Sequence, residues 1–586
     1  MKDSLKEKST QQQENSIVKS LFLGQFPESS VFPYPEIDKD EVETLKIVLE
    51  SIQKFLSGRE EDFKAWDLKG EQPEDFINSI KELGLFGLII PEEYGGIGLS
   101  NTSYSRVIQE TSKFDASVSL TVGAHSSIGM KGLLLFGNDE QKKKYLPKLA
   151  SGETIAAFCL TEPGAGSDAA SIKTNAKKNP DGTWTLNGEK IWITNGAFAG
   201  FFTVFARTES EGGKISTFIV ERSWPGISTG PKEDKMGIRA SATTSVFFEN
   251  VIVPAENLLG EEGKGFKIAM EILNNGRTGL GGGCVGGIKK LIHLAAVQAT
   301  ERKQFGESIS HYGLIKQKIA QMTVDCFAAE SVVGMVGHLI DSGSDDYSIE
   351  AAISKIFCTE ALWKASFEAL QIAGGNGFMR DYPYERVVRD SRINMIFEGT
   401  NEILRLYIAL SGMKDVGKYL EDVLHGTEGI FNDPIKGFGI LSNYAAKRLS
   451  QITHIGRDRI SAHHPCLQNE ADTIERYTQS FAAATEGLIR RHGKRVVDKQ
   501  LAMKRLADIA IDLFVSICVI SRASKIVKLQ GEAEAGQIMN IAKVFIRDAR
   551  RRMTQNLSRL DHNDDQKIEE IADYIFESKF YSWDLF

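Results

Sequence analysis

The sequence predicts an α+β protein that is mainly helical, with its strands gathered in one central domain. Three observations predict this class. Apolar residues recur at helical spacing through both ends of the chain, strand-like runs cluster between those ends, and the two kinds of segment do not alternate. The lack of alternation argues against a doubly wound parallel sheet. With 586 residues, 42% of them hydrophobic, the chain can form several cores.

The first part of the chain is predicted to be a flexible extension followed by a helical domain. Residues 1–37 begin with a Gln-rich stretch that lacks an apolar core, so we expect no signal or transit peptide there. Residues 38–156 have helical periodicity, which Gly95, Gly96 and Gly98 interrupt. The expected helices cover residues 40–52, 76–83, 104–114 and 118–135.

A compact β domain is expected over residues 157–260. Asn187-Gly188 lies between two strand-like runs, residues 183–186 and 190–194, and is predicted to form a hairpin turn because both residues tolerate positive φ. Further strands are expected over residues 201–207, 215–220 and 245–248.

Helical periodicity returns after the β domain, first in a bundle over residues 261–415 and then in an extra domain over residues 416–586. The expected helices cover residues 266–274, 288–302, 314–342, 349–372, 400–410, 472–492, 500–530 and 534–560. Residues 281–286 spell G-x-G-x-x-G, but no strand precedes them, so closely packed helices are expected instead of a dinucleotide-binding fold.

Composition excludes several function classes. The net charge is −8 and the isoelectric point is near 5.8, so nucleic-acid binding is not expected. Residues 431–586 carry 24 basic and 20 acidic residues, which fits either solvated helix faces or a surface for an anionic partner. Six scattered cysteines without a C-x-x-C pair fit a reducing compartment, and no apolar run is long enough to span a membrane.

Common catalytic and metal-binding motifs do not occur in the sequence. There is no P-loop, no H-E-x-x-H and no G-x-S-x-G motif, so phosphate transfer, zinc peptidase and esterase chemistry have no support. His463, His464 and Cys466 lie close together, but Pro465 interrupts them and no second ligand pair follows at the usual spacing. We therefore expect a loop there and no metal site.

The most informative stretch is Ala156–Asp168, where a strand end is predicted to run into a loop rich in glycine and proline. Its backbone N–H groups and the hydroxyls of Thr161 and Ser167 could bind a planar, anionic ligand. A purely structural turn explains the same residues equally well.

This stretch resembles the first signature of the acyl-CoA dehydrogenase family. Five further family motifs follow in order, at residues 190–196, 235–241, 302–306, 371–378 and 397–402, and the resemblance covers about residues 40–586. Residues 274–277, 397–401 and 403–406 resemble the corresponding residues of the very-long-chain branch. The last part of this chain also resembles the extra C-terminal helical domain of that branch. The resemblance implies an acyl-CoA dehydrogenase-like fold with an N-terminal helical domain, a middle β domain, a helical bundle and the extra domain.

The resemblance also implies a reaction. The family removes hydrogens from Cα and Cβ of an acyl-CoA in fatty-acid β-oxidation, leaves a trans-2-enoyl-CoA, and passes electrons from FAD to an electron-transferring flavoprotein. Glu398 is the implied base for the α-proton, and FAD accepts the β-hydrogen as hydride. An apolar slot raises the pKa of such a carboxyl and makes it a better base. In isolation, Glu398 could equally be a carboxylate at a helix start.

Further site residues follow from motif positions. The implied FAD-binding residues are Phe158, Leu160, Thr161, Gly166, Ser167, Trp192, Ile193, Thr194, Arg302, Gln304, Phe305, Gln371, Gly374, Gly375, Thr400, Asn401 and Glu402. The implied substrate-binding residues are Ser167, Lys214, Asn274, Asn275, Arg277 and Phe397. In this family Arg302 and residues 371–375 approach the FAD of a neighbouring subunit, which implies a homo-oligomer, and in this branch a homodimer.

The resemblance also leads to expectations about the length of the acyl chain and the location of the protein. Gly123 and Ala124 are small residues of the segment that closes the acyl pocket, and they favour either a long acyl chain or tight helix packing. Relatives use an amphipathic membrane-binding stretch where this chain has residues 430–449, but Pro434 weakens a helix there, so membrane contact is an open option. Without the targeting segment of the mitochondrial enzymes, a bacterial-type cytoplasmic protein is expected.

Two alternatives stay open. An acyl-CoA oxidase, in which oxygen reoxidises the flavin, would share these motifs. Some relatives act as assembly factors or scaffolds, for which the basic C-terminal helices would be the partner surface.

Overall fold

The computed structural model describes residues 16–209, 212–428 and 459–585, which form two compact units. The larger unit comprises Tyr34–Ile403. The smaller unit combines the described residues up to Pro33 with those from Leu404 onward. The boundary falls in the first turn of helix α14 (Asn401–Glu428).

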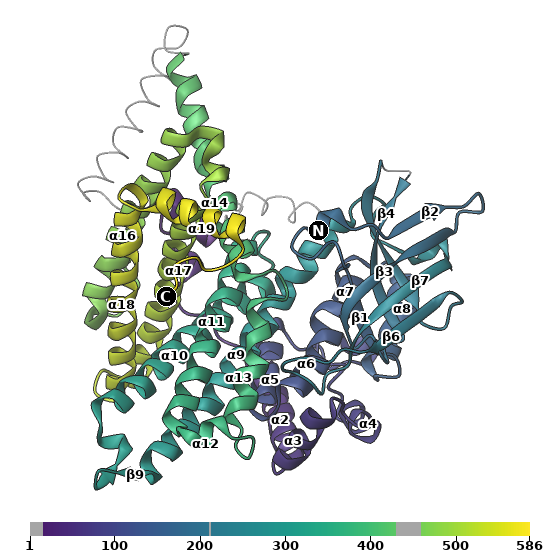
Figure 1. Cartoon of the computed structure of the whole chain (residues 1–586), viewed down its shortest axis with the longest axis horizontal. Coiled ribbons are helices and arrows are strands. Elements are labelled where there is room, and N and C mark those ends of the chain that lie inside the picture. Colours follow the sequence, from purple (N-terminus) through teal and green to yellow (C-terminus); the bar gives the residue numbers. More distant parts are fainter. Residues whose placement is uncertain (1–15, 210–211, 429–458, 586) are drawn as a thin grey trace, which may run out of the picture. The chain divides into compact units, whose positions relative to one another are not determined.

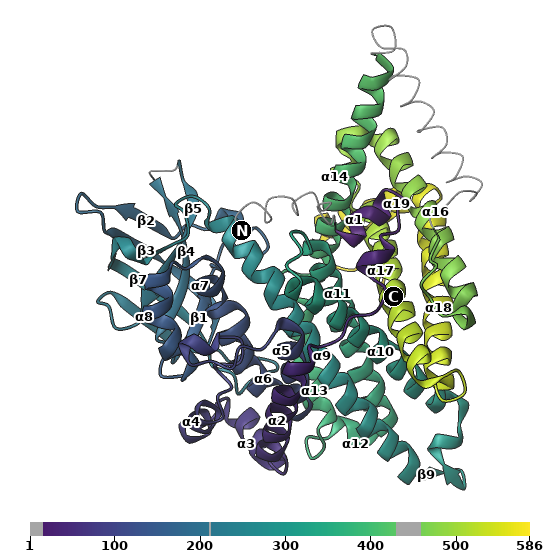
Figure 2. The same cartoon turned by 180° about the vertical axis from the view of Figure 1, so that it is seen from behind.

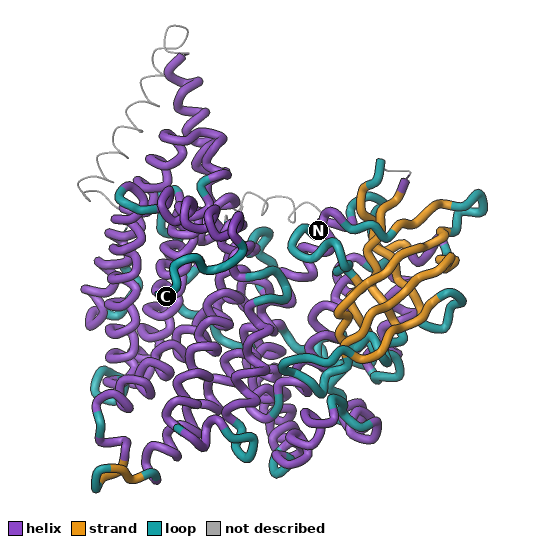
Figure 3. The backbone as a smooth tube through the Cα atoms, in the orientation of Figure 1, coloured by secondary structure: helices purple, strands orange, loops and turns teal. Residues whose placement is uncertain are grey.

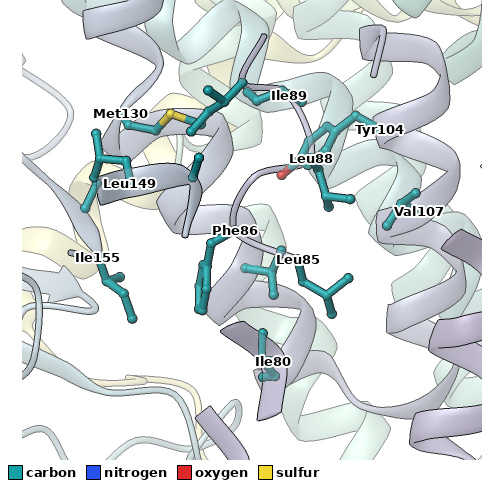
Figure 4. Close-up of a cluster of buried hydrophobic side chains, with 14 of the residues drawn as sticks. Ile80, Leu85, Phe86, Leu88, Ile89, Tyr104, Val107, Met130, Leu149 and Ile155 are labelled. Carbon is teal, nitrogen blue, oxygen red and sulfur yellow. The ribbon is translucent and has the colours of Figure 1, made fainter. Parts of the chain in front are cut away.

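The larger unit begins with helices around one apolar core. These helices are α2 (Lys39–Leu56), α3 (Glu60–Lys69), α4 (Glu74–Glu82), α5 (Asn101–Phe114), α6 (Ala116–Gly123), α7 (Lys131–Phe136) and α8 (Asp139–Ala150). Figure 4 shows part of the core, where Ile80, Phe86 and Ile155 lie among the buried side chains. The helix expected over residues 118–135 is divided, because a π-helix (Ala124–Gly129) separates α6 from α7. Such π segments are frequent at functional sites.

The middle of the larger unit is a single eight-stranded sheet (Figure 3). Its strands are β1 (Ala156–Cys159), β2 (Asn175–Lys178), β3 (Trp184–Thr194), β4 (Phe201–Thr208), β5 (Lys214–Glu221), β6 (Ile227–Lys232), β7 (Thr243–Val253) and β8 (Leu258–Leu259). The order is β6-β7-β3-β2-β4-β5-β8, and β1 also pairs with β4. Both β1 and β2 run parallel to β4, so the sheet is mixed.

The predicted Asn187-Gly188 hairpin is wrong. Both residues lie inside the single long strand β3, at a register shift opposite β7. The hairpin instead joins β2 to β3 through residues 179–183, where Gly182 N–H donates to the Asn179 carbonyl oxygen at 3.0 Å. Asp181 accepts hydrogen bonds from the backbone and hydroxyl of Thr183, which is how aspartate favours turns. The signal in the sequence was the Pro-Asp-Gly triplet.

Long helices complete the larger unit. They are α9 (Gly265–Glu301), α10 (Gly313–Asp341) and α11 (Ser348–Ala373), followed by the short α12 (Gly375–Phe378) and α13 (Tyr384–Arg392). A two-stranded ribbon, β9 (Lys303–Gln304) with β10 (Glu307–Ser308), links α9 to α10. Helix α9 packs against α5, α10 and α11, so it is the central helix of the bundle.

Helix α9 is continuous across the glycine-rich run where two separate helices were expected. A Cβ at Gly282 would lie 2.5 Å from the Ser105 carbonyl oxygen, and one at Gly286 would lie 2.0 Å from the Gln109 carbonyl oxygen. The glycines therefore allow the backbones of α9 and α5 to come into contact. The expectation of closely packed helices is confirmed, and no dinucleotide-binding βαβ unit surrounds this run in the described chain.

The smaller unit consists of α1 (Ile17–Phe22), the later part of α14, and helices α16 (Gln468–His492), α17 (Gln500–Gln530), α18 (Gly536–Asp561) and α19 (Asp565–Ser578). The structure differs here from the flexible extension expected over residues 1–37. Val18, Leu21 and Phe22 are fully buried, and the Phe22 ring meets Phe481 edge-on with centroids 4.5 Å apart. Figure 2 shows α1 among the helices of this unit.

Helices α9 and α10 are long and apolar enough to cross a membrane by length and composition alone. Half or more of the most apolar part of each is buried inside the protein, as in the core helices of a bundle. The membrane-binding stretch considered at residues 430–449 lies outside the described residues.

The glycine contact between α9 and α5 predicts a stability difference between two neighbouring substitutions. We expect Gly286→Ala to destabilise the larger unit by about 1–3 kcal/mol or more, because backbone atoms must move to admit the methyl group. Gly283→Ala is the control in the same helix. There the nearest atom to a Cβ would be the Ser112 side-chain oxygen at 3.1 Å, and the gain in helix propensity offsets the strain. Denaturant unfolding of both variants measures the difference, and equal stability would contradict the packing argument.

Candidate active site

The carboxylate of Glu398 lies at the centre of the candidate site. Glu398 precedes α14 and has a φ of +56°, and Gly399 follows with a φ of +90°. Its Oε2 atom is buried without a hydrogen-bond partner among the described residues. A Cβ at Gly276 of α9 would lie 3.5 Å from Oε1 and 3.6 Å from Oε2, so the carboxylate faces a glycine. Positive φ at a non-glycine residue costs free energy and is typical of functional positions.

Burial raises the pKa of Glu398 to about 7, while Arg277 and Lys355 act in the opposite direction. The cause is the loss of hydration of the charged form, which two nearby cations only partly offset. A carboxyl with this pKa is half ionised near neutral pH, so it can accept a proton from a substrate and release it again.

Two predicted residues on α9 lie beside Glu398. Arg277 is buried, and its Nη2 donates to the Glu398 carbonyl oxygen at 3.3 Å while its Nη1 donates to Asn274 Oδ1 at 2.6 Å. Asn275 is also buried and donates to the Tyr347 hydroxyl at 2.6 Å. Arg277 was expected to bind the substrate, and these contacts give it a role in holding the backbone of Glu398.

Sequence analysis missed Lys355, which is fully buried on α11. Its Nζ donates to the Gly399 carbonyl oxygen and to Asn401 Oδ1, both at 2.8 Å. It therefore fixes the chain one residue after the carbonyl oxygen that Arg277 contacts. The available signal was a lone lysine within the apolar run of residues 349–362, a position where an unpaired cation is rarely tolerated.

Tyr104 of α5 is a second missed residue. A Cβ at Gly279 would lie 3.2 Å from its ring, and burial, together with the charge of Glu398, raises the pKa of its hydroxyl. Tyr104, Ser127 and Thr278 line a cavity of about 10 Å³, which is the size of one water molecule. The π-helix also borders the site. A Cβ at Gly276 would lie 2.8 Å from the Ile128 side chain, nearer than either oxygen of the Glu398 carboxylate.

A second group of predicted residues surrounds the loop after β1. Ile191 N–H of β3 donates to the Thr161 carbonyl oxygen at 3.0 Å. The fully buried Lys190 donates to the Leu160 carbonyl oxygen at 3.1 Å and to Glu162 Oε1 at 2.7 Å. Lys190 is the first residue of the family motif at residues 190–196, and no role was predicted for it. The buried ion pair fixes the start of the glycine loop against β3.

Trp192 is 64% exposed although it belongs to a strand, and its φ is +56°. A register shift between β3 and β7 at this point turns the chain. Thr161 and Thr194 are half-buried on the same two segments, as is Phe158, while Ser167 and Gly166 are exposed on the loop. Leu160 and Ile193 are buried in the core beneath. An exposed indole beside hydroxyls and free loop amides suits a flat, polar-edged ring.

The remaining predicted cofactor residues lie elsewhere. Arg302, Gln304 and Phe305 belong to the ribbon after α9, where Phe305 is 94% exposed with a φ of +56°. Gln371, Gly374 and Gly375 are exposed at the end of α11. In both views β9 lies far from the sheet that carries Trp192 (Figures 1 and 2). These residues therefore do not reach the surface around Trp192 of their own chain.

Four predicted residues remain to be placed. Thr400 is half-buried and its hydroxyl accepts the Ile403 N–H at 3.3 Å, while Glu402 is exposed on the first turn of α14. Phe397 is half-buried beside Glu398 in sequence. Lys214 is exposed at the start of β5, and no described contact joins it to Glu398.

Family models match four parts of the chain. The N-terminal, middle and C-terminal domains of acyl-CoA dehydrogenase match residues 43–153, 157–251 and 263–413. A model described as the ACAD9/ACADV C-terminal domain matches residues 465–581.

Individual relatives agree with these models. The human very long-chain specific acyl-CoA dehydrogenase is 45% identical over 531 residues, which cover 89% of this chain and 80% of that protein. A probable acyl-CoA dehydrogenase of Bacillus subtilis is 38% identical and covers 82% of this chain and 81% of its own. The crystal structure of a Bacillus anthracis acyl-CoA dehydrogenase complexed with FAD has a TM-score of 0.80 at 33% identity, and covers 96% of this chain and 95% of its own.

Proposed function

The chain belongs to the acyl-CoA dehydrogenase family, and we propose that Glu398 is the base with which it takes the α-proton of a long-chain acyl-CoA. The reaction is the FAD-dependent conversion of acyl-CoA to trans-2-enoyl-CoA in fatty-acid β-oxidation. The observation that carries the assignment of the base is the Glu398 carboxylate, whose Oε2 is buried without a hydrogen-bond partner among the described residues and whose pKa is raised to about 7.

Glu398 contributes to the reaction in two ways. Its ionised carboxylate removes the α-proton, and its buried position excludes water that would otherwise solvate the charge. Its backbone N–H is the donor that this chain offers to the thioester carbonyl, where negative charge develops as the proton leaves. The positive φ values at Glu398 and Gly399 set the direction of that backbone, and the bonds from Arg277 and Lys355 keep it in place.

The surface around Trp192 fits the isoalloxazine ring of FAD. The exposed indole can cover one face, and the hydroxyls of Thr161 and Thr194 can bond to the polar edge. When bound, FAD supplies the hydride acceptor for the β-hydrogen. Lys190 and Glu162 keep the loop that carries these groups in a single position.

Substrate residues divide into two groups. Ser167 and Lys214 are exposed and can meet the polar CoA portion, whereas Asn274, Asn275, Arg277 and Phe397 lie around Glu398 and orient the acyl end. Gly123 ends α6 and Ala124 begins the π-helix, and neither carries a large side chain. Together with the name of the human relative, these small residues support a long acyl chain.

An electron-transferring flavoprotein is the acceptor that we propose, because the four matched models and the named relatives are dehydrogenases. The alternative acyl-CoA oxidase would form hydrogen peroxide during turnover. The scaffold alternative is disfavoured by the complete Glu398 site, since a protein without catalysis has no need of a strained, buried carboxylate.

Homodimerisation accounts for the exposed residues far from the sheet. Arg302 would donate charge-assisted bonds to the pyrophosphate of the FAD in the second copy. Phe305 and Phe378, which are 94% and 79% exposed, would be covered by that copy.

We infer a cytoplasmic location from the six cysteines, all of which are free thiols. Peripheral membrane contact stays a possibility for the C-terminal domain. Cell fractionation that placed the protein in an exported or integral membrane fraction would contradict a cytoplasmic location.

Replacing the base separates flavin binding from chemistry. We expect Glu398→Gln to keep the bound-FAD spectrum and to slow anaerobic bleaching by palmitoyl-CoA by about 100-fold or more, because the amide cannot accept the proton. Glu153→Gln, at an exposed carboxylate of the same unit, is the control and should bleach at the normal rate. If Glu398→Gln bleached at the normal rate, Glu398 would not be the base. Peroxide formation by the normal protein in air would favour the oxidase.

The raised pKa of Glu398 predicts a pH dependence. Since the base must be ionised, the rate of flavin reduction should rise as pH increases through about 7 and level off above it. Lys355→Met removes a cation that lowers this pKa, so the rise should move to higher pH. Lys364→Met changes an exposed lysine of the same helix and should leave the profile unchanged. Stopped-flow rates across pH measure both, and a merely structural role for Lys355 would lower the rate without moving the profile.

The dimer proposal predicts that a residue far from Trp192 controls FAD retention. We expect Arg302→Glu to weaken FAD binding by about tenfold or more, since a charge-assisted bond becomes a repulsion. Lys303→Glu, at the next exposed position, is the control. Light scattering with flavin absorbance measures mass and cofactor together. A normal protein that is monomeric with full FAD would rule out the shared site.

A further inference from the structure

We propose that His464, Cys466 and Glu532 of the smaller unit form a zinc site that joins the start of α16 to the turn between α17 and α18. Neither the family function nor the motifs assign a role to these residues. His464 and Cys466 lie on either side of Pro465 at a short 3₁₀-helix, and Glu532 follows the last residues of α17.

The three ligand atoms are already close together. Nδ1 of His464, Sγ of Cys466 and a carboxylate oxygen of Glu532 all lie within 4.8 Å of one another. The Nδ1–Sγ distance is 3.1 Å and the Nδ1–Oε1 distance to Glu532 is 3.7 Å. Tetrahedral zinc with its usual bond lengths requires ligand atoms about 3.3–3.6 Å apart. Small side-chain rotations would therefore place all three around one ion.

The donor set selects the metal. A thiolate, an imidazole and a carboxylate together suit Zn²⁺, whereas Ca²⁺ and Mg²⁺ require mainly oxygen ligands. His464 and Cys466 are half-buried and Glu532 is 60% exposed, so an ion can enter from solvent.

A further carboxylate lies in the neighbourhood of the thiol. Glu470, on the first turn of α16, acts electrostatically on the Cys466 thiol, and its Oε2 is buried without a hydrogen-bond partner among the described residues. Either this carboxylate or water would complete the tetrahedron. Lys543 of α18 also acts electrostatically on the thiol, and its charge opposes that of the ion.

The surrounding loop is fixed before any ion binds. His464 N–H donates to Ser524 Oγ at 3.0 Å, and Lys528 Nζ donates to the Ala462 carbonyl oxygen at 2.8 Å. Both partners lie on α17, so the loop already sits against the helix that leads to Glu532. The neighbouring His463 is occupied by contacts to Ile460 and Gln468, which leaves His464 as the available imidazole.

The competing explanation is an ordinary helix cap. Nδ1 of His464 accepts the Cys466 N–H, but at 3.4 Å this bond is long and weak. A cap requires neither the thiol nor Glu532. The Cys466 thiol and the Glu532 carboxylate, the latter from a separate segment, both approach this nitrogen, and this favours the metal.

Cobalt substitution tests the site in the full-length holoenzyme. After EDTA treatment and buffer exchange, we expect uptake of one Co²⁺ per chain. The difference spectrum against the metal-free holoenzyme should show intense visible bands and a thiolate-to-cobalt band, and Zn²⁺ should abolish both. Cys466→Ser should lose the thiolate band, and Glu532→Gln should bind Co²⁺ at least about tenfold more weakly. Glu534→Gln, at an exposed carboxylate two residues away, is the control.

Glu532 is an exposed side chain, so Glu532→Gln should fold even if the cysteine variant does not. A thiolate band that persists in Cys466→Ser, an affinity unchanged in Glu532→Gln, or the absence of stoichiometric uptake would each overturn the proposal. FAD content and flavin reduction by acyl-CoA are measured on the same samples, so failure of the metal site is distinguishable from failure of the dehydrogenase assignment.

Discussion

The contact of helix α9 with α5 through glycine is the constraint on which the catalytic half of the molecule depends. A helix ordinarily keeps its neighbour at a distance set by side chains. Here Gly282 and Gly286 leave α5 backbone oxygens where Cβ atoms would otherwise lie. The same helix carries Gly276 against the Glu398 carboxylate and Arg277 against its backbone. Close packing in one part of α9 thus fixes the position of the site residues in another.

Burial and charge compensation are balanced around Glu398. Full neutralisation by a contacting cation would depress the pKa of the carboxyl and make it a poor base at neutral pH. Arg277 and Lys355 instead bond to backbone oxygens at Glu398 and Gly399, which leaves the carboxylate itself without a bonded cation among the described residues. The cations therefore hold the loop in place while the raised pKa persists.

Sequence patterns predicted the fold class and the helical-β-helical order, because long periodic segments are local signals. A contiguous motif pointed to Glu398 as the proposed base. They failed where distant segments decide the outcome. Asn187-Gly188 has ideal turn chemistry, yet pairing with β7 makes it part of a strand. The glycine run in α9 is helical only because α5 packs on it. Lys355 and Tyr104 belong to no contiguous motif, and only the folded chain brings them beside Glu398.

The placement of α1 has a consequence for synthesis of the chain on the ribosome. This segment is translated before the larger unit, but the helices that bury Val18, Leu21 and Phe22 include α16 and α17, which are translated after that unit. At about 5–20 residues per second, the apolar face of α1 must wait for about 20–90 s, until synthesis has passed the larger unit and reached α16. During that interval it is a target for chaperones and for association with other nascent chains. The larger unit is thus translated completely before the smaller unit, which surrounds it in sequence, can fold.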